Sequence, residues 1–333
     1  MQLGSFTITP DGPFSLEEAA RFGFGQRAGG DWDGVMRLAF CLDGYTDQVA
    51  AEVRQDQASP DQASPDQASP DQASPDQASP DQASPDHAGT VHCVVHGPAG
   101  ADLGRVRRQV ARVLSLDHDG REFSRVGERD PVIGRLQAAA PGLRPPLFYS
   151  PYEAAIWCVL SARRPAPQMM RVRERLGHEH GAVFDLAGEQ LPALPTPDQL
   201  LAVESFPGIP ADRWPRLHGV ARAALDGRLD ADRLLAEGPE RAMAGLQALA
   251  GIGPFYSALI VIRGTGFTDV LPVSEPRVLD LVARLYQLDG PPPEAEFRAL
   301  AQPWKPFRTW AAVLIRAAAA RVPGGSGAPA GVR

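Results

Sequence analysis

Lysine and cysteine are scarce in this chain, and long hydrophobic runs are missing. Among its 33 basic residues only Lys305 is a lysine, and its cysteines, Cys41, Cys93 and Cys158, lie far apart. An odd, scattered set of cysteines gives no sign of a disulfide framework or a cysteine metal site. No apolar stretch approaches the ~20 residues of a membrane-spanning helix, and the N-terminus lacks a signal-peptide pattern. We expect a cytoplasmic protein without a metal, a cofactor or a membrane partner.

The composition is that of a folded protein of two domains, interrupted by one biased segment. The 333 residues are 44% apolar and 22% charged, which is ordinary for a globular chain long enough to bury two cores. Six copies of Asp-Gln-Ala-Ser-Pro run from Asp56 to Pro85, and without their aspartates the net charge of −7 becomes about −1. The copies carry proline at every fifth position and no bulky apolar side chain. We therefore predict a disordered insert over 55–87, between neighbouring strands.

Hydrophobic periodicity divides the chain into two parts. Apolar residues alternate in the first part, which predicts strands at 35–42, 48–53 and 90–96. Helical spacing begins after Asp102 and marks 103–114, 153–161, 167–176, 197–204, 212–225, 278–288 and 308–321. The pattern predicts a small α/β domain over 1–125, an all-helical domain over 126–322 and a disordered tail over 323–333.

The most informative segment is a pair of short helices joined by Gly251-Ile252-Gly253. Leu246, Leu249 and Ile252 share one face, and an apolar face continues in the second helix. Glycines without Cβ atoms let another surface approach closely, while the second helix presents free N–H groups and its positive dipole end. A phosphate of a nucleic-acid backbone fits such a site. A plain turn after a helix is the alternative reading of the two glycines.

Residues 246–264 resemble the helix-hairpin-helix of the DNA glycosylase superfamily. Their continuation is most similar to its 3-methyladenine DNA glycosylase II branch, which excises alkylated bases. The run from Trp304 to Trp310 resembles that branch's Trp-Lys/Arg-Pro-Trp-Arg-Ser-Tyr signature, and further matches lie at 9–16, 141–146 and 150–155. The resemblance implies an α+β fold: a small N-terminal antiparallel-sheet domain with helices, followed by an all-helical helix-hairpin-helix glycosylase domain.

The resemblance also implies a reaction. In base excision repair, a monofunctional DNA glycosylase flips a damaged base out of double-stranded DNA and hydrolyses its N-glycosidic bond. Relatives with an iron-sulfur cluster carry four cysteines after the hairpin, and no cysteine here follows Cys158. Relatives that also nick the strand use a hairpin lysine as nucleophile, and the matching position here is Phe255. The resemblance therefore implies a monomeric, monofunctional hydrolase that excises alkylated, 3-methyladenine-like bases.

In the family the catalytic carboxylate is an aspartate just ahead of the helix that follows the hairpin. Counting without gaps from Gly251 places Glu275 at this position, whereas anchoring on Leu-Pro-Val places Ser274 there. Glu275 keeps the negative charge that would stabilise the developing sugar cation. The helix dipole alone also favours an acidic residue at this point, so a first-turn role stays open. Asp269 is the fallback carboxylate.

The resemblance assigns further roles near the hairpin. The residues expected to contact the DNA backbone are Gly251, Ile252, Gly253 and Ser257. Arg163 and Arg164 occupy the loop that wedges into the duplex in relatives, and Arg163 is either the wedge or a phosphate contact. The candidates for the base pocket are Phe255, Tyr256, Trp157, Tyr152 and Trp310, with core packing as their alternative. Arg316 stands where relatives have an aromatic near the end of the last helix, so the pocket differs in the base that it accepts.

Two other functions stay open. A homologue that lost its catalytic carboxylate would bind damaged DNA without excising a base. A helical interaction module would use the hairpin for a protein partner, and its binding to DNA would be absent or independent of salt. The cluster of Arg163, Arg164, Arg171, Arg173 and Arg175 is consistent with a basic cleft for DNA and equally with a solvated helix face.

Overall fold

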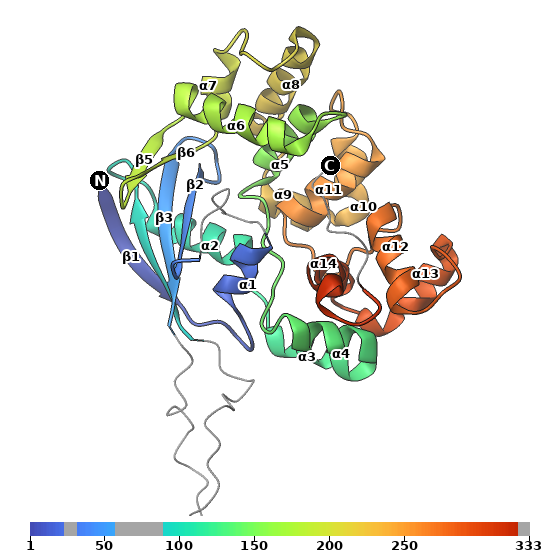
Figure 1. The fold of residues 1–333 in the computed structure, drawn as a ribbon. Coiled ribbons are helices and arrows are strands. Elements are labelled where there is room, and N and C mark those ends of the chain that lie inside the picture. The colour runs from blue at the N-terminus through green and yellow to red at the C-terminus, as the bar shows by residue number, and fades with distance from the viewer. Residues whose placement is uncertain (23–31, 57–88, 326–333) are drawn as a thin grey trace, which may run out of the picture.

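The N-terminal part of the protein is built on one antiparallel sheet. The structure, a computed structural model, describes residues 1–22, 32–56 and 89–325. Its strands are β1 (Gln2–Ile8), β2 (Val35–Cys41), β3 (Gln48–Gln55) and β4 (Val91–His96), in the order β1-β4-β3-β2. Every neighbouring pair is antiparallel. Figure 1 shows the sheet on one side of the molecule and the helices on the other.

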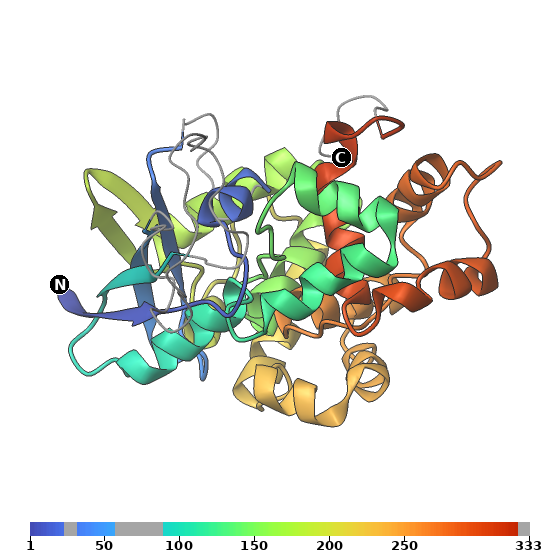
Figure 2. The ribbon, with the colours of Figure 1, turned by 90° about the horizontal axis from the view of Figure 1, so that it is seen from below.

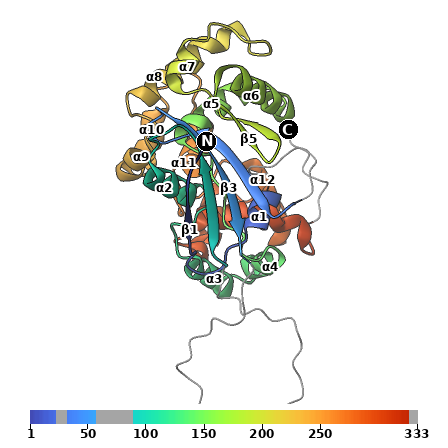
Figure 3. The ribbon, with the colours of Figure 1, turned by 90° about the vertical axis from the view of Figure 1, so that its left-hand side faces the viewer.

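Alternation along the strands creates the first hydrophobic core. Val91, Cys93 and Val95 of β4 are buried, whereas the residues between them are only half-buried. The short helix α1 (Leu16–Arg21) and the longer α2 (Leu103–Val113) contribute to this core, and Val106, Val110 and others of α2 pack with the strands. Figure 3 shows the strands from their own side, in front of the helical part. The sheet thus forms one end of the molecule.

Helices make up most of the remaining chain. They are α3 (Gly120–Arg129), α4 (Pro131–Ala139), α5 (Pro151–Ser161), α6 (Ala166–His180), α7 (Pro197–Leu201), α8 (Trp214–Leu225), α9 (Ala231–Glu237), α10 (Pro239–Leu246), α11 (Pro254–Gly264), α12 (Pro276–Leu285), α13 (Glu294–Leu300) and α14 (Arg308–Ala318). Short 3-10 turns at Ala211–Arg213, Gln302–Trp304 and Ala319–Arg321 accompany them. A two-stranded hairpin of β5 (Val183–Leu186) and β6 (Glu189–Pro192) lies between α6 and α7.

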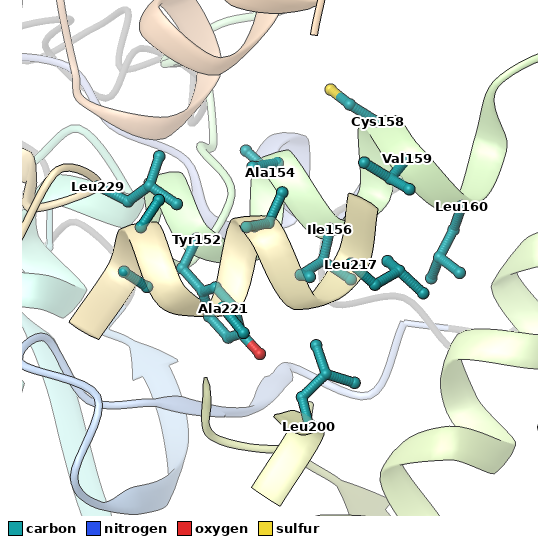
Figure 4. Close-up of a cluster of buried hydrophobic side chains, with 14 of the residues drawn as sticks. Tyr152, Ala154, Ile156, Cys158, Val159, Leu160, Leu200, Leu217, Ala221 and Leu229 are labelled. Carbon is teal, nitrogen blue, oxygen red and sulfur yellow. The ribbon is translucent and has the colours of Figure 1, made fainter. Parts of the chain in front are cut away.

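Two hydrophobic clusters hold the helices together. One cluster joins α5, α6, α8 and α11 and includes the fully buried Tyr152, Ile156 and Leu217, which Figure 4 shows at close range. The other joins α3 and α4 to α12, α13 and α14, so residues near 130 pack with residues near 310. Figure 2 shows α12 and α13 of this group, in orange, at the end away from the sheet. The chain therefore leaves and re-enters the same helical group.

A buried ion pair fastens the sheet to the helices. The Glu153 carboxylate, on α5, accepts a hydrogen bond from the Cys41 amide of β2 at 3.3 Å and pairs with Arg173 of α6 at 2.5 Å. Arg175 donates to the Pro207 carbonyl at 2.8 Å. These two arginines of the predicted basic cluster thus have structural partners. Of the other members of the cluster, Arg163 and Arg171 are exposed and Arg164 is half-buried.

The predicted fold class, an antiparallel-sheet domain followed by a mainly helical domain, is confirmed. The β5–β6 hairpin interrupts the part that was expected to be all-helical. α3 crosses the expected boundary at residue 125, and the division into domains stays a prediction. The repeat over 55–87 and the tail over 323–333 lie almost entirely outside the described residues. No described helix combines the length and the apolar character that crossing a membrane requires.

Candidate functional site

A cavity of about 500 Å³ opens among four helices of the second part. Its wall is formed by the C-terminal end of α5 and the turn after it, by α11, by the beginning of α12 and by α14. A volume of this size is typical of sites for small ligands. Phe22 and Phe148 complete the wall from outside these helices. Neither of these two positions carries a helical or motif signal in the sequence.

Glu275 lies in this cavity at the N-cap of α12. Its side chain is 19% exposed, and its Oε1 accepts a hydrogen bond from the Arg277 amide at 3.2 Å. Its Oε2 pairs with Nη1 of Arg316, on α14, at 3.1 Å. The carboxylate is therefore held at the cavity wall by two contacts. Ser274 also lines the cavity, so the structure brings both alternatives of the alignment to the same wall.

The motif from Trp304 to Trp310 fixes the loop that leads to Glu275. Arg308, at the start of α14, makes an ion pair with Asp269 through Nε at 2.7 Å and Nη2 at 2.9 Å. The Thr309 hydroxyl accepts from the Val270 amide at 2.9 Å, and the Thr309 amide donates to a carbonyl of the same loop. Asp269, the fallback carboxylate, is thus a structural anchor and does not line the cavity.

Guanidinium groups outnumber carboxylates around the cavity. Arg164, Arg263, Arg277 and Arg316 line it, and Glu275 is the only carboxylate among its described lining residues. Arg263 lies 5.2 Å from the Phe22 ring centroid and donates to the Pro146 carbonyl at 2.7 Å.

Burial lowers the pKa of Arg263 to about 10, and the neighbouring Arg316 charge acts in the same direction. At neutral pH Arg263 is still a cation, because this pKa lies well above 7. The wall therefore carries a clear excess of positive charge.

The structure brings three of the five predicted pocket aromatics to the cavity. Phe255 and Tyr256 of α11 and Trp157 of α5 line it, and Phe255 is 48% exposed. Burial raises the pKa of the Tyr256 phenol, so it stays protonated at neutral pH. Tyr152 and Trp310 are core residues instead. The Tyr152 hydroxyl donates to a backbone carbonyl at 3.0 Å, and Trp310 packs against the phenylalanines of the second helical cluster.

The hairpin between α10 and α11 has the geometry that the glycines require. Gly251 has a φ of +91°, a conformation that side chains disfavour. Gly253 is the N-cap of α11 with extended backbone, and a Cβ built on it meets nothing within 4 Å. Ile252 is buried in the first helical cluster. The Ser257 amide bonds to the Gly253 carbonyl at 2.9 Å, and its hydroxyl donates to Pro254.

These contacts divide the four residues predicted to bind the DNA backbone into those that support the fold and those that an anion can reach. The side chain of Ile252 and both polar groups of Ser257 serve the fold. The first intrahelical bond of α11 is the one from the Ser257 amide, so the amides of Phe255 and Tyr256 precede it. Those two amides and the open face at Gly253 are where an anion could approach.

The turn after α5 presents the predicted wedge. Arg163 is exposed with a φ of +54°, a left-handed conformation that is uncommon for residues other than glycine. Arg164 follows it and lines the cavity. Arg213 donates to three backbone carbonyl oxygens within residues 159–162 and so caps the C-terminal end of α5. No motif or periodicity in the sequence indicates this role of Arg213.

Comparison with known proteins finds related sequences over part of the chain. The chain is 29% identical to DNA-3-methyladenine glycosylase 2 of Escherichia coli over 188 residues. These residues make up 55% of this chain and 63% of that protein. The chain is 27% identical over 214 residues to the probable bifunctional transcriptional activator/DNA repair enzyme AlkA of Mycobacterium tuberculosis, 63% of this chain and 42% of that one. The chain thus spans less than two thirds of each of these curated relatives. No protein-family model matches it.

Solved structures are similar over nearly the whole chain. The 3-methyladenine DNA-glycosylase from Archaeoglobus fulgidus superposes with a TM-score of 0.67 at 18% identity, over 93% of this chain and 96% of that one. The 8-oxoguanine glycosylase/lyase of Clostridium acetobutylicum, solved with double-stranded DNA, superposes with a TM-score of 0.61 at 14% identity, over 96% and 97%. At these identities the similarity establishes the arrangement of sheet and helices.

Proposed function

The chain belongs to the helix-hairpin-helix DNA glycosylase superfamily, and on this premise we propose that it is a monofunctional DNA glycosylase of base excision repair. Its substrate would be double-stranded DNA that contains a damaged base, with alkylated bases, as in the names of its relatives, within its range. The proposed reaction is hydrolysis of the N-glycosidic bond, by a monomer in the cytoplasm and without a cofactor.

The observation that carries the proposal is the position of Glu275. It is a carboxylate in a cavity large enough for a flipped base, at the N-cap of the helix after the hairpin. When the bond between C1′ and the base lengthens, positive charge develops on the sugar. A fixed carboxylate beside that charge lowers the barrier, because it was oriented before the reaction began. Ser274, its neighbour on the wall, carries no charge and would do much less.

DNA binding is assigned to the two features that frame the cavity. The N-terminal amides of α11 would bind a backbone phosphate, and Gly253 would let it approach. Arg163 would enter the space that the flipped base leaves in the duplex, because the turn after α5 exposes it beside the cavity. Trp157, Tyr256 and Phe255 would stack on the flipped base.

The experiment is an assay of base release. The purified protein is incubated with DNA treated with a methylating agent or with nitrous acid, and released bases are separated from the polymer. We expect modified bases in the soluble fraction, and we expect the strand to stay intact until alkali cleaves the abasic sites. Phe255 occupies the position of the lyase lysine, so borohydride should trap no covalent complex with the DNA.

One specific contact favours a second candidate, a damage-binding homologue without catalysis. Glu275 already has a cationic partner in Arg316, and a fully neutralised carboxylate would stabilise a sugar cation poorly. This candidate predicts tight binding to lesion DNA with no base release under any condition. The same assay, combined with measured affinities, therefore decides between the two.

A further inference from the structure

The pair of Glu275 and Arg316 bears on the charge of the base that the cavity accepts. Arg316 lies two turns along α14 from Arg308, on the wall that faces the beginning of α12. Its side chain is 39% exposed and contacts Glu275 through Nη1 alone. A guanidinium has five N–H groups, so this contact leaves donors that can bind a ligand in the cavity.

Two other arginines add to the positive charge that Arg316 brings to the cavity. Arg164 and Arg263 line the same cavity, and Nε of each is buried without a hydrogen-bond partner. Buried donors without partners favour ligands that bring acceptors. The only carboxylate among the described lining residues, Glu275, is already paired. A positively charged base would therefore be repelled by the guanidinium groups and would find no free carboxylate among the described lining residues.

The charge of the damaged base determines which charge the enzyme must stabilise on it as the N-glycosidic bond breaks. When the bond from C1′ to a neutral base breaks, its electron pair goes to the base, which leaves as an anion. Water adds its hydroxyl to C1′, and the second proton of that water ends on the base. A base that is already cationic leaves as a neutral molecule, and the proton of the attacking water goes to solvent. Only the neutral base carries a negative charge in the transition state. Relative to the free enzyme and DNA, a cation at the base oxygen therefore stabilises the transition state of the neutral base and destabilises that of the cationic base.

Resting on the proposed glycosylase function, we propose that Arg316 selects neutral, oxygen-bearing damaged bases over positively charged ones. Arg316 donates to an exocyclic oxygen of the flipped base and stabilises the negative charge that the base acquires as it leaves. Glu275, on the other side of the bond, stabilises the positive charge on the sugar. The carboxylate and the guanidinium are 3.1 Å apart in the cavity. In the reaction the carboxylate would pair with the charge on the sugar and the guanidinium with the charge on the base.

The test compares two bases that share an oxygen and differ in charge. One duplex carries a single hypoxanthine, which is neutral, and the other a single 7-methylguanine, which is cationic. Single-turnover rates are measured at sub-saturating enzyme, where they report kcat/KM, for the wild type, Arg316→Met, Arg316→Lys and Arg298→Met. Arg298 is an exposed arginine of α13 paired with Glu294, away from the cavity, and its variant is the matched control.

The expected result is a selective effect. The wild type should release hypoxanthine at least tenfold faster than 7-methylguanine. Arg316→Met should lower hypoxanthine release about 10²-fold, as loss of one charge-stabilising donor does. It should leave 7-methylguanine release unchanged or raise it, because Glu275 then faces the sugar without a competing partner. Arg316→Lys should recover part of the loss, and Arg298→Met should match the wild type.

Two outcomes would overturn the inference while the glycosylase function stands: a wild-type preference for 7-methylguanine, or an Arg316→Met variant that loses both activities equally. Release of neither base would refute the glycosylase function for these lesions, and the inference is then judged by affinity. Duplexes with 2′-fluoro sugars, which resist hydrolysis, should bind the wild type more tightly when they carry hypoxanthine. The opposite order of affinities would contradict the selection that we assign to Arg316.

Discussion

The two glycines of the hairpin should respond differently to the same substitution. Gly253 has a φ of −88°, which any residue adopts, and a Cβ there meets nothing within 4 Å. Gly253→Val should therefore fold with unchanged or slightly higher stability. Gly251 has a φ of +91°, and a Cβ there would lie 3.1 Å from Cδ of Arg216. Gly251→Val should cost about 1–3 kcal/mol of stability through backbone strain.

DNA affinity should fall in the variant that stays stable. A valine at Gly253 would separate a phosphate from the amides of α11, and a hydrogen bond to a charged group contributes about 1.5–3 kcal/mol. The expected loss is roughly 10- to 100-fold in Kd, measured by fluorescence anisotropy at fixed salt, with thermal melting as the control for folding. Gly290→Val, after α12, is the control, because Gly290 has no positive φ and no atom within 4 Å of a built Cβ. A folded Gly253→Val protein with wild-type affinity would remove the hairpin from DNA binding.

Three further predictions concern the support of the site. Deletion of Asp56–Pro85 should change the free energy of unfolding by less than about 1 kcal/mol. The strands β3 and β4 on either side are adjacent and antiparallel, and Asp86 would take the place of Asp56 after Gln55. A large fall in Tm would contradict this prediction. Asp269→Asn should cost about 1–3 kcal/mol in urea unfolding, since it weakens the ion pair that anchors the loop to α14. Tyr152→Phe should lower the free energy of unfolding by about 1 kcal/mol and leave base release intact. Trp157→Ala should weaken the binding of lesion DNA. Equal effects of the two variants on DNA affinity would refute the placement of Tyr152 in the core and Trp157 at the cavity.

Local patterns predicted α2, α5 to α8, α12, α14 and the two helices joined by Gly251-Ile252-Gly253. They did not predict the helices α3, α4, α9 and α13 or the strands β1, β5 and β6. The helical periods of α2, α5, α8 and α14 come from apolar residues close in sequence, and their packing agrees with that spacing. β5 and β6 have only four residues each, too few for a period to stand out. β1 is an edge strand with a glycine and mostly partial burial, so its alternation is weak. Long-range pairing, which defines these strands, leaves little trace in a local window.

Site residues that are marked by their type and their distance from a motif could be predicted from the sequence. Site residues that depend on which face of a helix is packed could not. Ungapped counting placed Glu275 at a position that the structure brings to the cavity. Tyr152 and Trp157 are both aromatic residues of α5, but five positions apart they lie on different faces of the helix. Only the neighbouring helices determine which face is core. The contact of Glu275 with Arg316 joins residues 41 positions apart, and its one trace in the sequence was an arginine where relatives have an aromatic.

In the proposed reaction the Glu275 carboxylate drives base excision. The most direct measurement is the single-turnover rate of base release for Glu275→Gln, beside the wild type and Ser274→Ala, on one lesion duplex. The amide keeps the shape and removes the charge, so the rate should fall about 10²- to 10⁴-fold, while affinity for the lesion holds or rises. Ser274→Ala should stay close to the wild type. A Glu275→Gln enzyme as fast as the wild type, with Ser274→Ala inactive, would contradict the account.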